Sequence, residues 1–185
     1  MLMVSLAPGI LLIADPFLKD PNFARTVIFL CENDEKGSFG FVINRLFDQT
    51  LDSLIPDVIY PGIPVYYGGP VQVDTIHFMH QLPDQIQGGM QVVPGVYWGG
   101  RFDDVVELIN KGALDLRKIK FFIGYSGWTG GQLEEELKEK SWIPSESTPS
   151  LVFEPKEQQI WQLALRNLGS NFAMMANFPI DPSLN

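Results

Sequence analysis

The sequence has a single cysteine, Cys31, and lacks long apolar runs. One thiol excludes an intramolecular disulfide and a metal site built from several thiolates, so folding needs no oxidising compartment. No apolar stretch approaches the ~20 residues that a membrane-spanning helix requires. Residues 1–14 have no basic segment, and Pro8 and Asp15 interrupt their apolar character, which is not the pattern of a signal peptide. We therefore expect a cytoplasmic protein that makes no use of a membrane.

Basic residues are also scarce, with 13 Lys and Arg against 22 Asp and Glu and a formal net charge of -9. Nucleic-acid affinity arises mainly from basic side chains that displace counterions from phosphates, so this balance disfavours direct DNA binding. The one basic group that a DNA-binding face would use is Arg117, Lys118 and Lys120.

Apolar residues make up 45% of the 185 residues, which is enough for one domain with a real core, and we predict a single domain over 1–185. Short β-branched and aromatic runs fill the first hundred residues and indicate mainly antiparallel strands. The expected strands are 10–14, 26–32, 40–44, 65–67, 75–81 and 92–98. The polar segment 33–38 is expected to be a hairpin loop.

The second half of the chain has helical periodicity. Phe102, Val105 and Ile109 recur on one helical face and Gly112 stands just past its end, which predicts an amphipathic helix. Further elements are expected as a turn of helix at 51–55, a buried strand at 119–124, and helices at 130–140 and 157–168. In the helix at 130–140, Glu134 and Lys138 are expected to form a stabilising pair. Strands first and helices later predict an α+β fold.

Motifs spread along the chain carry a family resemblance. The most specific is Gly124-Tyr125-Ser126-Gly127-Trp128, followed by Gly131-Gln132-Leu133-Glu134. The others are Leu12-Ile13-Ala14, Asp20–Val27, Cys31-Glu32-Asn33, Gly37, Gly40, Asn44, Gly68-Gly69-Pro70-Val71, Phe78-Met79-His80 and Trp142. With these, the chain resembles the AlgH/YqgE family of bacterial proteins over nearly its whole length. The resemblance implies a bifurcated sheet curled into a pseudo-barrel with helices packed around it. Members are commonly labelled transcriptional regulators, and no reaction is generally attached to them.

The segment Gly124–Trp128 is similar to the Gly-x-Ser-x-Gly turn that presents a nucleophilic serine. Trp128 occupies the place where that motif needs its second glycine. We therefore interpret the segment as a tight strand-to-helix turn that needs small residues, and a nucleophilic Ser126 is the alternative.

Metal and thiol chemistry have little support in the residue pattern. His77 and His80 stand three apart on a predicted strand, so their side chains point to opposite faces and cannot share one ion. Cys31 lies in an apolar run and is most simply a small core residue. We expect neither a metal nor a cofactor.

Two glycine turns, Gly68-Gly69-Pro70 and Gly130-Gly131-Gln132, form a candidate anion site with exposed backbone N–H groups. Arg25 or Arg45 would complete it, although turn geometry explains the glycines equally well and Arg25 has Asp15 as an alternative ion-pair partner. The candidate ligand or interaction residues are Arg25, Asn44, Gly68, Gly69, Tyr125, Trp128, Gly131 and Gln132.

Three functions are open at this point. The leading hypothesis is a non-enzymatic regulatory or interaction protein that acts through an unknown protein partner, with weak self-association as a further expectation, because tyrosine and tryptophan rings beside glycines suit a contact surface. The second is a domain for a small anionic ligand or nucleotide, or a hydrolase-like enzyme, using a cleft near Arg25, Asn44, Gly68 and Tyr125. The third is the DNA-binding transcriptional regulator that the family label implies.

Overall fold

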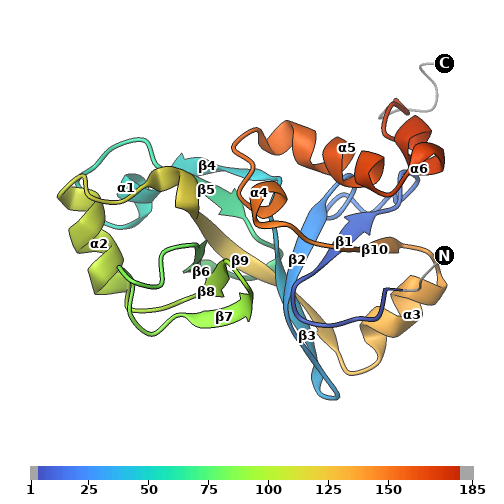
Figure 1. Cartoon of the computed structure of the whole chain (residues 1–185), viewed down its shortest axis with the longest axis horizontal. Coiled ribbons are helices and arrows are strands. Elements are labelled where there is room, and N and C mark those ends of the chain that lie inside the picture. The colour runs from blue at the N-terminus through green and yellow to red at the C-terminus, as the bar shows by residue number, and fades with distance from the viewer. Residues whose placement is uncertain (1–3, 180–185) are drawn as a thin grey trace.

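The strand β9 (Ile119–Thr129) is the axis of the molecule, because both parts of the sheet pair with it. The computed structural model describes residues 4–179, so both ends of the predicted 1–185 domain lie outside the described residues. From Ile119 to Ile123, β9 pairs with β5 (Pro64–Tyr67) on one side and with β6 (Val71–His80) on the other. From Ser126 to Thr129 it pairs with β3 (Gly37–Val42). The sheet therefore divides at the middle of β9, where Gly124 has a φ of 67° (Figure 1).

The two branches have different strand neighbours. One branch runs in the order β10-β1-β2-β3-β9, with β1 at Ile10–Ala14, β2 at Val27–Asp34 and β10 at Trp142–Glu146. The other runs β9-β6-β8-β7, with β7 at Met90–Val93 and β8 at Val96–Trp98, while β4 (Leu46–Thr50) pairs with β5. Only β5 and β9 pair in parallel among the described strands. The predicted bifurcated, mainly antiparallel sheet is confirmed.

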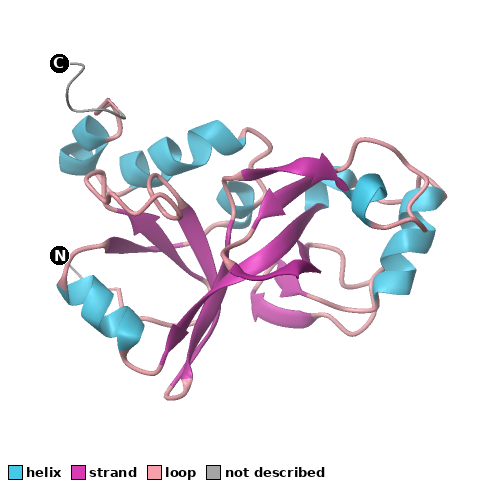
Figure 2. Ribbon diagram, turned by 180° about the vertical axis from the view of Figure 1, so that it is seen from behind, coloured by secondary structure: helices cyan, strands magenta, loops and turns pink. Residues whose placement is uncertain are grey.

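Helices surround the sheet, which curls into a half-barrel (Figure 2). The helices are α1 (Leu51–Leu54), α2 (Phe102–Asn110), α3 (Gln132–Lys138), α4 (Pro149–Val152), α5 (Glu157–Asn167) and α6 (Ser170–Met175), with a short 3₁₀ turn at Leu116–Lys118. In Figure 1, α1 and α2 lie beside the second branch, and α5 and α6 lie over the first. The fold is α+β, as predicted. None of the described helices has the length and apolar character needed to cross a membrane.

The apolar residues form separate cores on the two faces of the sheet. Because side chains alternate along a strand, Phe121 and Phe122 on β9 point to opposite faces. Phe122 packs in a cluster with Phe29, Phe41 and Trp161, whereas Phe121 packs in another with residues of β5 and α2. A third cluster contains Trp128 and Trp142 beneath α3. Each fully buried side chain of this size contributes roughly 1.5–3 kcal/mol, so β9 joins cores on both faces into one structure.

Several predicted elements differ in the structure. The segment Gly124–Trp128, predicted as a turn, continues β9, because its backbone pairs with β3 up to Thr129. The predicted strand 92–98 is a hairpin of β7 and β8, because Pro94 and Gly95, whose φ is 84°, make a turn inside it. The predicted loop 33–38 is mostly strand, since Asp34 Oδ1 accepts from the N–H groups of Lys36 and Gly37 and closes a tight turn.

Smaller corrections concern the surface and the C-terminal region. Lys138 pairs with Glu135, Nζ to Oε1 2.6 Å, instead of with the predicted Glu134. The strands β4 and β10 and the helices α4 and α6 were not predicted, because they are short and interrupted by polar residues or proline. The helix predicted at 157–168 is confirmed as α5, and Gly169, with a φ of 116°, follows its end.

Candidate functional site

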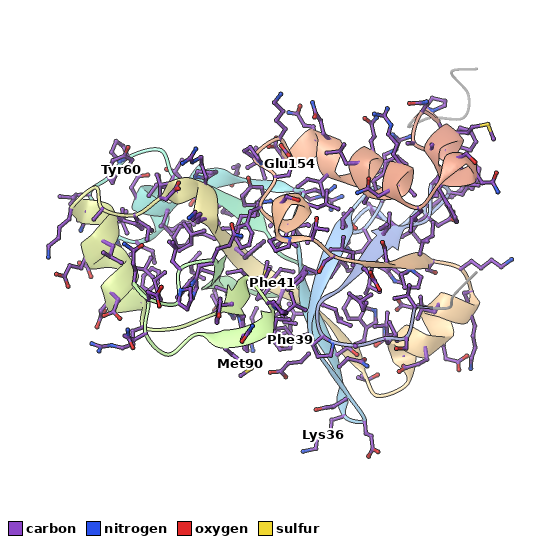
Figure 3. All side chains as sticks on the ribbon, viewed as in Figure 1. Lys36, Phe39, Phe41, Tyr60, Met90 and Glu154 are labelled. Carbon is purple, nitrogen blue, oxygen red and sulfur yellow. The ribbon has the colours of Figure 1, made fainter. Side chains whose placement is uncertain are left out.

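A groove of about 710 Å³ lies where the two branches of the sheet meet. We call it the aromatic groove. One side is the β2–β3 hairpin and the end of β9, and the other side is formed by β6 and β8. Figure 3 labels Phe39 beside the junction and Lys36 at the tip of the hairpin. The groove is lined by Glu32, Asp34, Lys36, Gly37, Ser38, Phe39, Val71, His77, Trp98, Tyr125, Gly127, Trp128, Thr129 and Gln132.

Aromatic rings from the four strands β3, β6, β8 and β9 form the interior of the groove. The Phe39 ring stands edge-on to Trp98 with centroids 4.8 Å apart, and edge-on to Tyr125 at 5.9 Å. His77 is edge-on to Tyr125 at 6.0 Å. Edge-to-face pairs of this kind stabilise by about 0.5–1.5 kcal/mol beyond the burial of their area. The rings therefore form a fixed apolar surface that remains partly exposed.

The floor of the groove is backbone at Gly127. Phe39 and Gly127 are directly opposed in the β3–β9 pairing and so face the same side. The ring of Tyr125 lies over Gly127, because a Cβ atom built there would be 3.2 Å from Tyr125 Cε2. Gly127 itself is exposed. A larger residue would fill this part of the groove.

His77 carries an unsatisfied polar atom in the wall. Its Nε2 is buried and has no hydrogen-bond partner within the described part of the chain. Burial lowers the pKa of His77 below its usual value of 6.5, so the ring is neutral at pH 7. Phe41 packs against the same ring, with centroids 5.3 Å apart. Buried polar atoms without a partner are uncommon, and here the atom lies in the wall of a groove.

Charged residues form the outer rim on the β2–β3 hairpin. Glu32, Asp34 and Lys36 are all exposed and line the groove. Glu32 opposes Phe39, and Asp34 opposes Gly37, so both acidic side chains stand on the face of the hairpin that carries the groove. The rim has a net negative charge, in agreement with the charge of -9 for the whole chain.

The structure divides the predicted site residues into two groups. Tyr125, Trp128 and Gln132 line the aromatic groove. Arg25 and Asn44 do not. The side chain of Asn44 binds the backbone of β2, with Nδ2 donating to Arg25 O at 2.9 Å and Oδ1 accepting from Val27 N at 2.8 Å.

Arg25 is held away from the groove by contacts with the C-terminal region. Its guanidinium lies 4.7 Å from the centroid of a Trp161 ring and donates to Phe178 O. Burial lowers its pKa. Asp15 uses Oδ1 to accept from Phe17 N, and no ion pair between Asp15 and Arg25 occurs within residues 4–179. Arg25 therefore fixes the entry to β2 against α5.

Gly68 and Gly69 allow the backbone between β5 and β6 to cross closely over β9. The chain passes over β9 between β5 and β6, and a Cβ atom at Gly68 would meet Gly124 O at 2.4 Å. At Gly69 it would meet Tyr125 O at 2.3 Å. The Gly68 N–H donates to Ile123 O, so this group is already used. Gly131, with a φ of 82°, precedes α3, and nothing lies within 4 Å of a Cβ built there.

Ser126 has a structural role. Its side chain is 0% exposed, and Oγ donates to Gly68 O at 3.0 Å, which fastens the same crossing. A buried hydroxyl that faces away from the groove has no access to a substrate there. The similarity of Gly124–Trp128 to the Gly-x-Ser-x-Gly turn therefore arises because β9 needs small residues where the backbone of Gly68 and Gly69 crosses it.

Two further residues have structural explanations. Cys31 is buried in the core, and burial raises the pKa of its thiol, as expected for a small core residue. His80 is fully buried, with Nδ1 accepting from Leu82 N at 3.1 Å and Nε2 3.1 Å from Gly99 O. Within residues 4–179, no three His, Cys, Asp or Glu side chains gather into a possible metal site.

The basic group of Arg117, Lys118 and Lys120, which a DNA-binding face would use, does not form one surface patch. Arg117 is bound to Asp115, Nε to Oδ1 3.0 Å. Lys120 is only 5% exposed, and its Nζ donates to the carbonyls of Ile43, Val152 and Glu154. Lys120 is buried because both faces of β9 are covered from Ile119 to Gly124, whereas Arg117 and Lys118 lie on the exposed turn before the strand.

Sequence reasoning missed two residues of the groove, Phe39 and His77. Phe39 lay between the predicted loop 33–38 and the predicted strand 40–44, although Phe39 and Phe41 alternate as strand residues do. His77 was weighed only as a metal ligand. Trp98 was recognised as an amphipathic ring but not placed, because its position depends on the β7–β8 hairpin.

A divided, curled sheet with peripheral helices and a groove at the division defines an AlgH type of α+β protein. The solution structure of the AlgH protein from Pseudomonas aeruginosa is similar, with a TM-score of 0.71 and 30% identity over 96% of this chain and 98% of that one. A crystal structure of a Corynebacterium diphtheriae protein shares the fold at a TM-score of 0.81, with 22% identity over 96% and 95% of the two chains.

Sequence comparison gives the same result. The AlgH-like family model matches residues 11–173. A UPF0301 protein of Chlorobium limicola is 41% identical over 97% of this chain and 96% of its own length, and one of Cytophaga hutchinsonii is 36% identical over 97% and 100%. The chain belongs to the AlgH-like family, and its resemblance to AlgH/YqgE proteins is confirmed.

Proposed function

We propose that this protein acts by binding a partner protein in the aromatic groove, as a non-enzymatic regulatory component of the cytoplasm. The observation that carries the proposal is the partly exposed ring cluster of Phe39, Trp98 and Tyr125 around a backbone floor at Gly127. Interface centres are enriched in such rigid aromatic residues, which bury a large area at a low cost in side-chain entropy.

The arrangement of polar groups supports binding over hydrolysis. The Ser126 hydroxyl is committed to Gly68 O, and Arg25 and Asn44 are committed to the backbone near β2 and to Trp161. The groups that remain at the groove are aromatic rings, the His77 imidazole, and the exposed charged side chains of Glu32, Asp34 and Lys36. Such groups suit recognition of a polypeptide better than attack on a substrate.

The remaining basic groups give little support to a DNA-binding regulator. Arg117 is paired with Asp115, and Lys120 is buried. Lys118 is the exposed and unpaired member of the group within residues 4–179. A single cation gives a weak, strongly salt-dependent attraction to phosphates. A regulatory role is therefore better explained by contact with another protein.

Site-specific photo-crosslinking in cells tests the proposal. A benzophenone amino acid is placed at Thr129, which is exposed in the groove, or at Lys111, which is exposed beyond the end of α2 as the matched control. We expect a discrete crosslinked product from Thr129 that is absent from Lys111 and is reduced by Trp98→Ala. Equal crosslinking from both positions, or none from Thr129, contradicts the proposal.

A ligand screen separates this function from the small-ligand alternative, which the groove volume of about 710 Å³ favours. A nucleotide or phosphorylated metabolite present at 100 times its Kd would stabilise the protein by about 2.7 kcal/mol. We expect no such shift in melting temperature. A shift that Tyr125→Ala removes would replace the partner-protein proposal with the ligand one.

A further inference from the structure

The end of β9 that borders the aromatic groove is an open sheet edge. Residues Ser126–Thr129 pair with β3 on one side. On the other side, β6 reaches only Val71, opposite Tyr125, and no described strand continues beyond that point. Pro70, which precedes Val71, has no N–H group to donate to a ladder, and the chain there turns to cross β9. No described strand therefore occupies the lane beside the last four residues of β9, and only the side chain of Gln132 reaches into it, at Thr129.

The backbone groups on this edge point into this lane. Thr129 N–H donates to Gln132 Oε1 at 3.1 Å and so is directed away from β3. In an antiparallel ladder, residues two apart direct their N–H and C=O groups to the same side. Gly127 therefore presents its N–H and C=O to the same lane, and it is exposed. The amide of Gln132 occupies the place that a strand's carbonyl would take.

The same lane opens onto the aromatic rings and the acidic rim. A strand added beside β9 would continue the line of β6, so every second side chain would face Phe39, Tyr125 and Trp98. Glu32 and Asp34 stand at the rim, and the chain as a whole carries a charge of -9. A guanidinium is attracted to the faces of aromatic rings, and neighbouring carboxylates add to that attraction. The chemistry therefore favours a basic side chain at the facing position.

We propose that the groove takes an extended segment of the partner polypeptide, which adds to the sheet as a strand beside Gly127–Thr129 and places an arginine among the rings. This rests on the function proposed above and specifies its occupant. Recognition then has two parts. The first is a backbone ladder at Gly127 and Thr129, in which a carbonyl of the added strand replaces the amide oxygen of Gln132 at the Thr129 N–H. The second is a side-chain contact with the rings and carboxylates. Sequence preference comes from the second part.

The probe is a capped peptide, Thr-Val-Thr-Arg-Thr-Val-Thr, titrated into the full chain and followed by the amide resonances of Gly127 and Thr129. We expect saturable shifts confined to β9, β3, β6 and β8. Replacing the arginine with glutamate is expected to weaken binding at least about tenfold. N-methylation of alternate residues, which removes ladder donors and keeps the side chains, is expected to weaken it by a similar factor.

Two variants of one residue test the ladder from the protein side. Gly127→Pro removes the N–H that points into the lane, whereas Gly127→Ala keeps it and asks only that the Tyr125 ring move by a few tenths of an ångström. Proline is tolerated at outward-facing positions of edge strands. We expect Gly127→Pro to weaken peptide binding at least about tenfold relative to Gly127→Ala. If the proline variant does not fold, the N-methylated peptide decides the same question on the unmodified protein.

The outcomes separate this inference from the function on which it rests. Absence of peptide shifts at millimolar concentration, or binding that is indifferent to N-methylation, overturns strand addition. Crosslinking from Thr129 in cells would still support the groove as a partner site in that case. Shifts at Gly127 that depend on protein concentration alone would identify a second copy of this chain as the occupant and would overturn the assignment of a basic partner segment.

Discussion

The ammonium group of Lys120 lies 4.6 Å from the centroid of the Tyr66 ring in the interior of the protein. Its three hydrogen bonds go to carbonyl oxygens of Ile43, Val152 and Glu154, and so connect β9 to the end of β3 and to α4. Burial lowers the pKa of Lys120 to about 7, against a smaller opposing effect of Glu157 and Glu154. Burial raises the pKa of Tyr66 to about 12.

The stability of the protein is expected to rise with pH between about 7.5 and 8.5. In this window the unfolded lysine binds a proton and the folded one does not, so unfolding takes up a proton and becomes less favourable as pH rises. The slope from Lys120 is about 1.4 kcal/mol per pH unit. Below pH 7 both states are protonated and this slope disappears. The window ends near pH 9, where Cys31, whose thiol pKa is raised by burial, begins to ionise in the unfolded state only. Tyr66 acts in the same direction near pH 10.

Urea unfolding at several pH values measures this effect in the wild type and in Lys120→Met. The methionine variant lacks the titrating group, so the stability difference between the two proteins should widen as pH rises. It should also be less stable, by about 1–3 kcal/mol at pH 9, because buried carbonyls lose their donor. Lys118→Met, at an exposed position, serves as the control and should track the wild type. Parallel pH curves for wild type and Lys120→Met would rule out a depressed pKa.

Gly69→Ala is expected to destabilise the protein by roughly 2–4 kcal/mol. Its Cβ would stand 2.3 Å from the carbonyl carbon and oxygen of Tyr125, and its φ is 152°. Since the neighbour is backbone, the crossing over β9 must open. Gly131→Ala isolates the cost of a positive φ, because nothing lies within 4 Å of its Cβ, and should lose about 1 kcal/mol. Chemical denaturation compares the two, and equal losses would mean that the crossing tolerates a methyl group.

Glu136→Leu is expected to cost about 2–4 kcal/mol and to change the tryptophan fluorescence. One carboxylate oxygen, Glu136 Oε2, accepts from the indole N–H of both Trp128 and Trp142, at 2.9 and 2.8 Å. Leucine leaves two largely buried donors without a partner. Glu136→Gln retains an acceptor oxygen and should recover part of the loss. Unfolding curves read by fluorescence test this, and a leucine variant as stable as the wild type would show that the two donors find other acceptors.

Cys31 is expected to react with a thiol reagent only through unfolding of the protein. Its side chain is buried, and burial, with Glu32 adding to the effect, raises the pKa of the thiol well above its usual value. The thiolate is the reactive form, so the native protein should be labelled slowly and the urea-unfolded protein rapidly. Stopped-flow labelling with a chromogenic disulfide gives both rates. Fast labelling of the native protein, at the rate of a free thiol, would mean that β2 opens locally.

Helices and strands with strong periodicity could be predicted from the sequence. The places where two distant segments cross or pair could not. The strand at Ile10–Ala14 and the amphipathic helix Phe102–Asn110 follow from local pattern and were correct. The strand identity of Gly124–Trp128 could not be predicted locally, because its glycines suit a turn as well as a close crossing. That crossing depends on Gly68 and Gly69, which lie more than fifty residues earlier in the chain.

The predicted site residues show the same limit. Tyr125, Trp128 and Gln132 are close in sequence and share the groove, whereas Arg25 and Asn44 are near one another but belong to a different region. Arg117, Lys118 and Lys120 are close in sequence, but the first two lie on the exposed 3₁₀ turn before β9 and Lys120 lies on the strand itself, where both faces are buried. Which side a polar residue faces is a property of sheet register, and register is fixed by contacts far away in the chain.

Because both branches of the sheet share β9, the two branches are expected to unfold together. Pulling β9 out of register would expose Phe121 to water on one face and Phe122 on the other at the same moment. Neither half can loosen and leave its neighbour intact, so thermal melting should proceed as one cooperative event across the whole fold. An arriving segment at Gly127 would therefore contact a strand that is anchored in both cores at its other end.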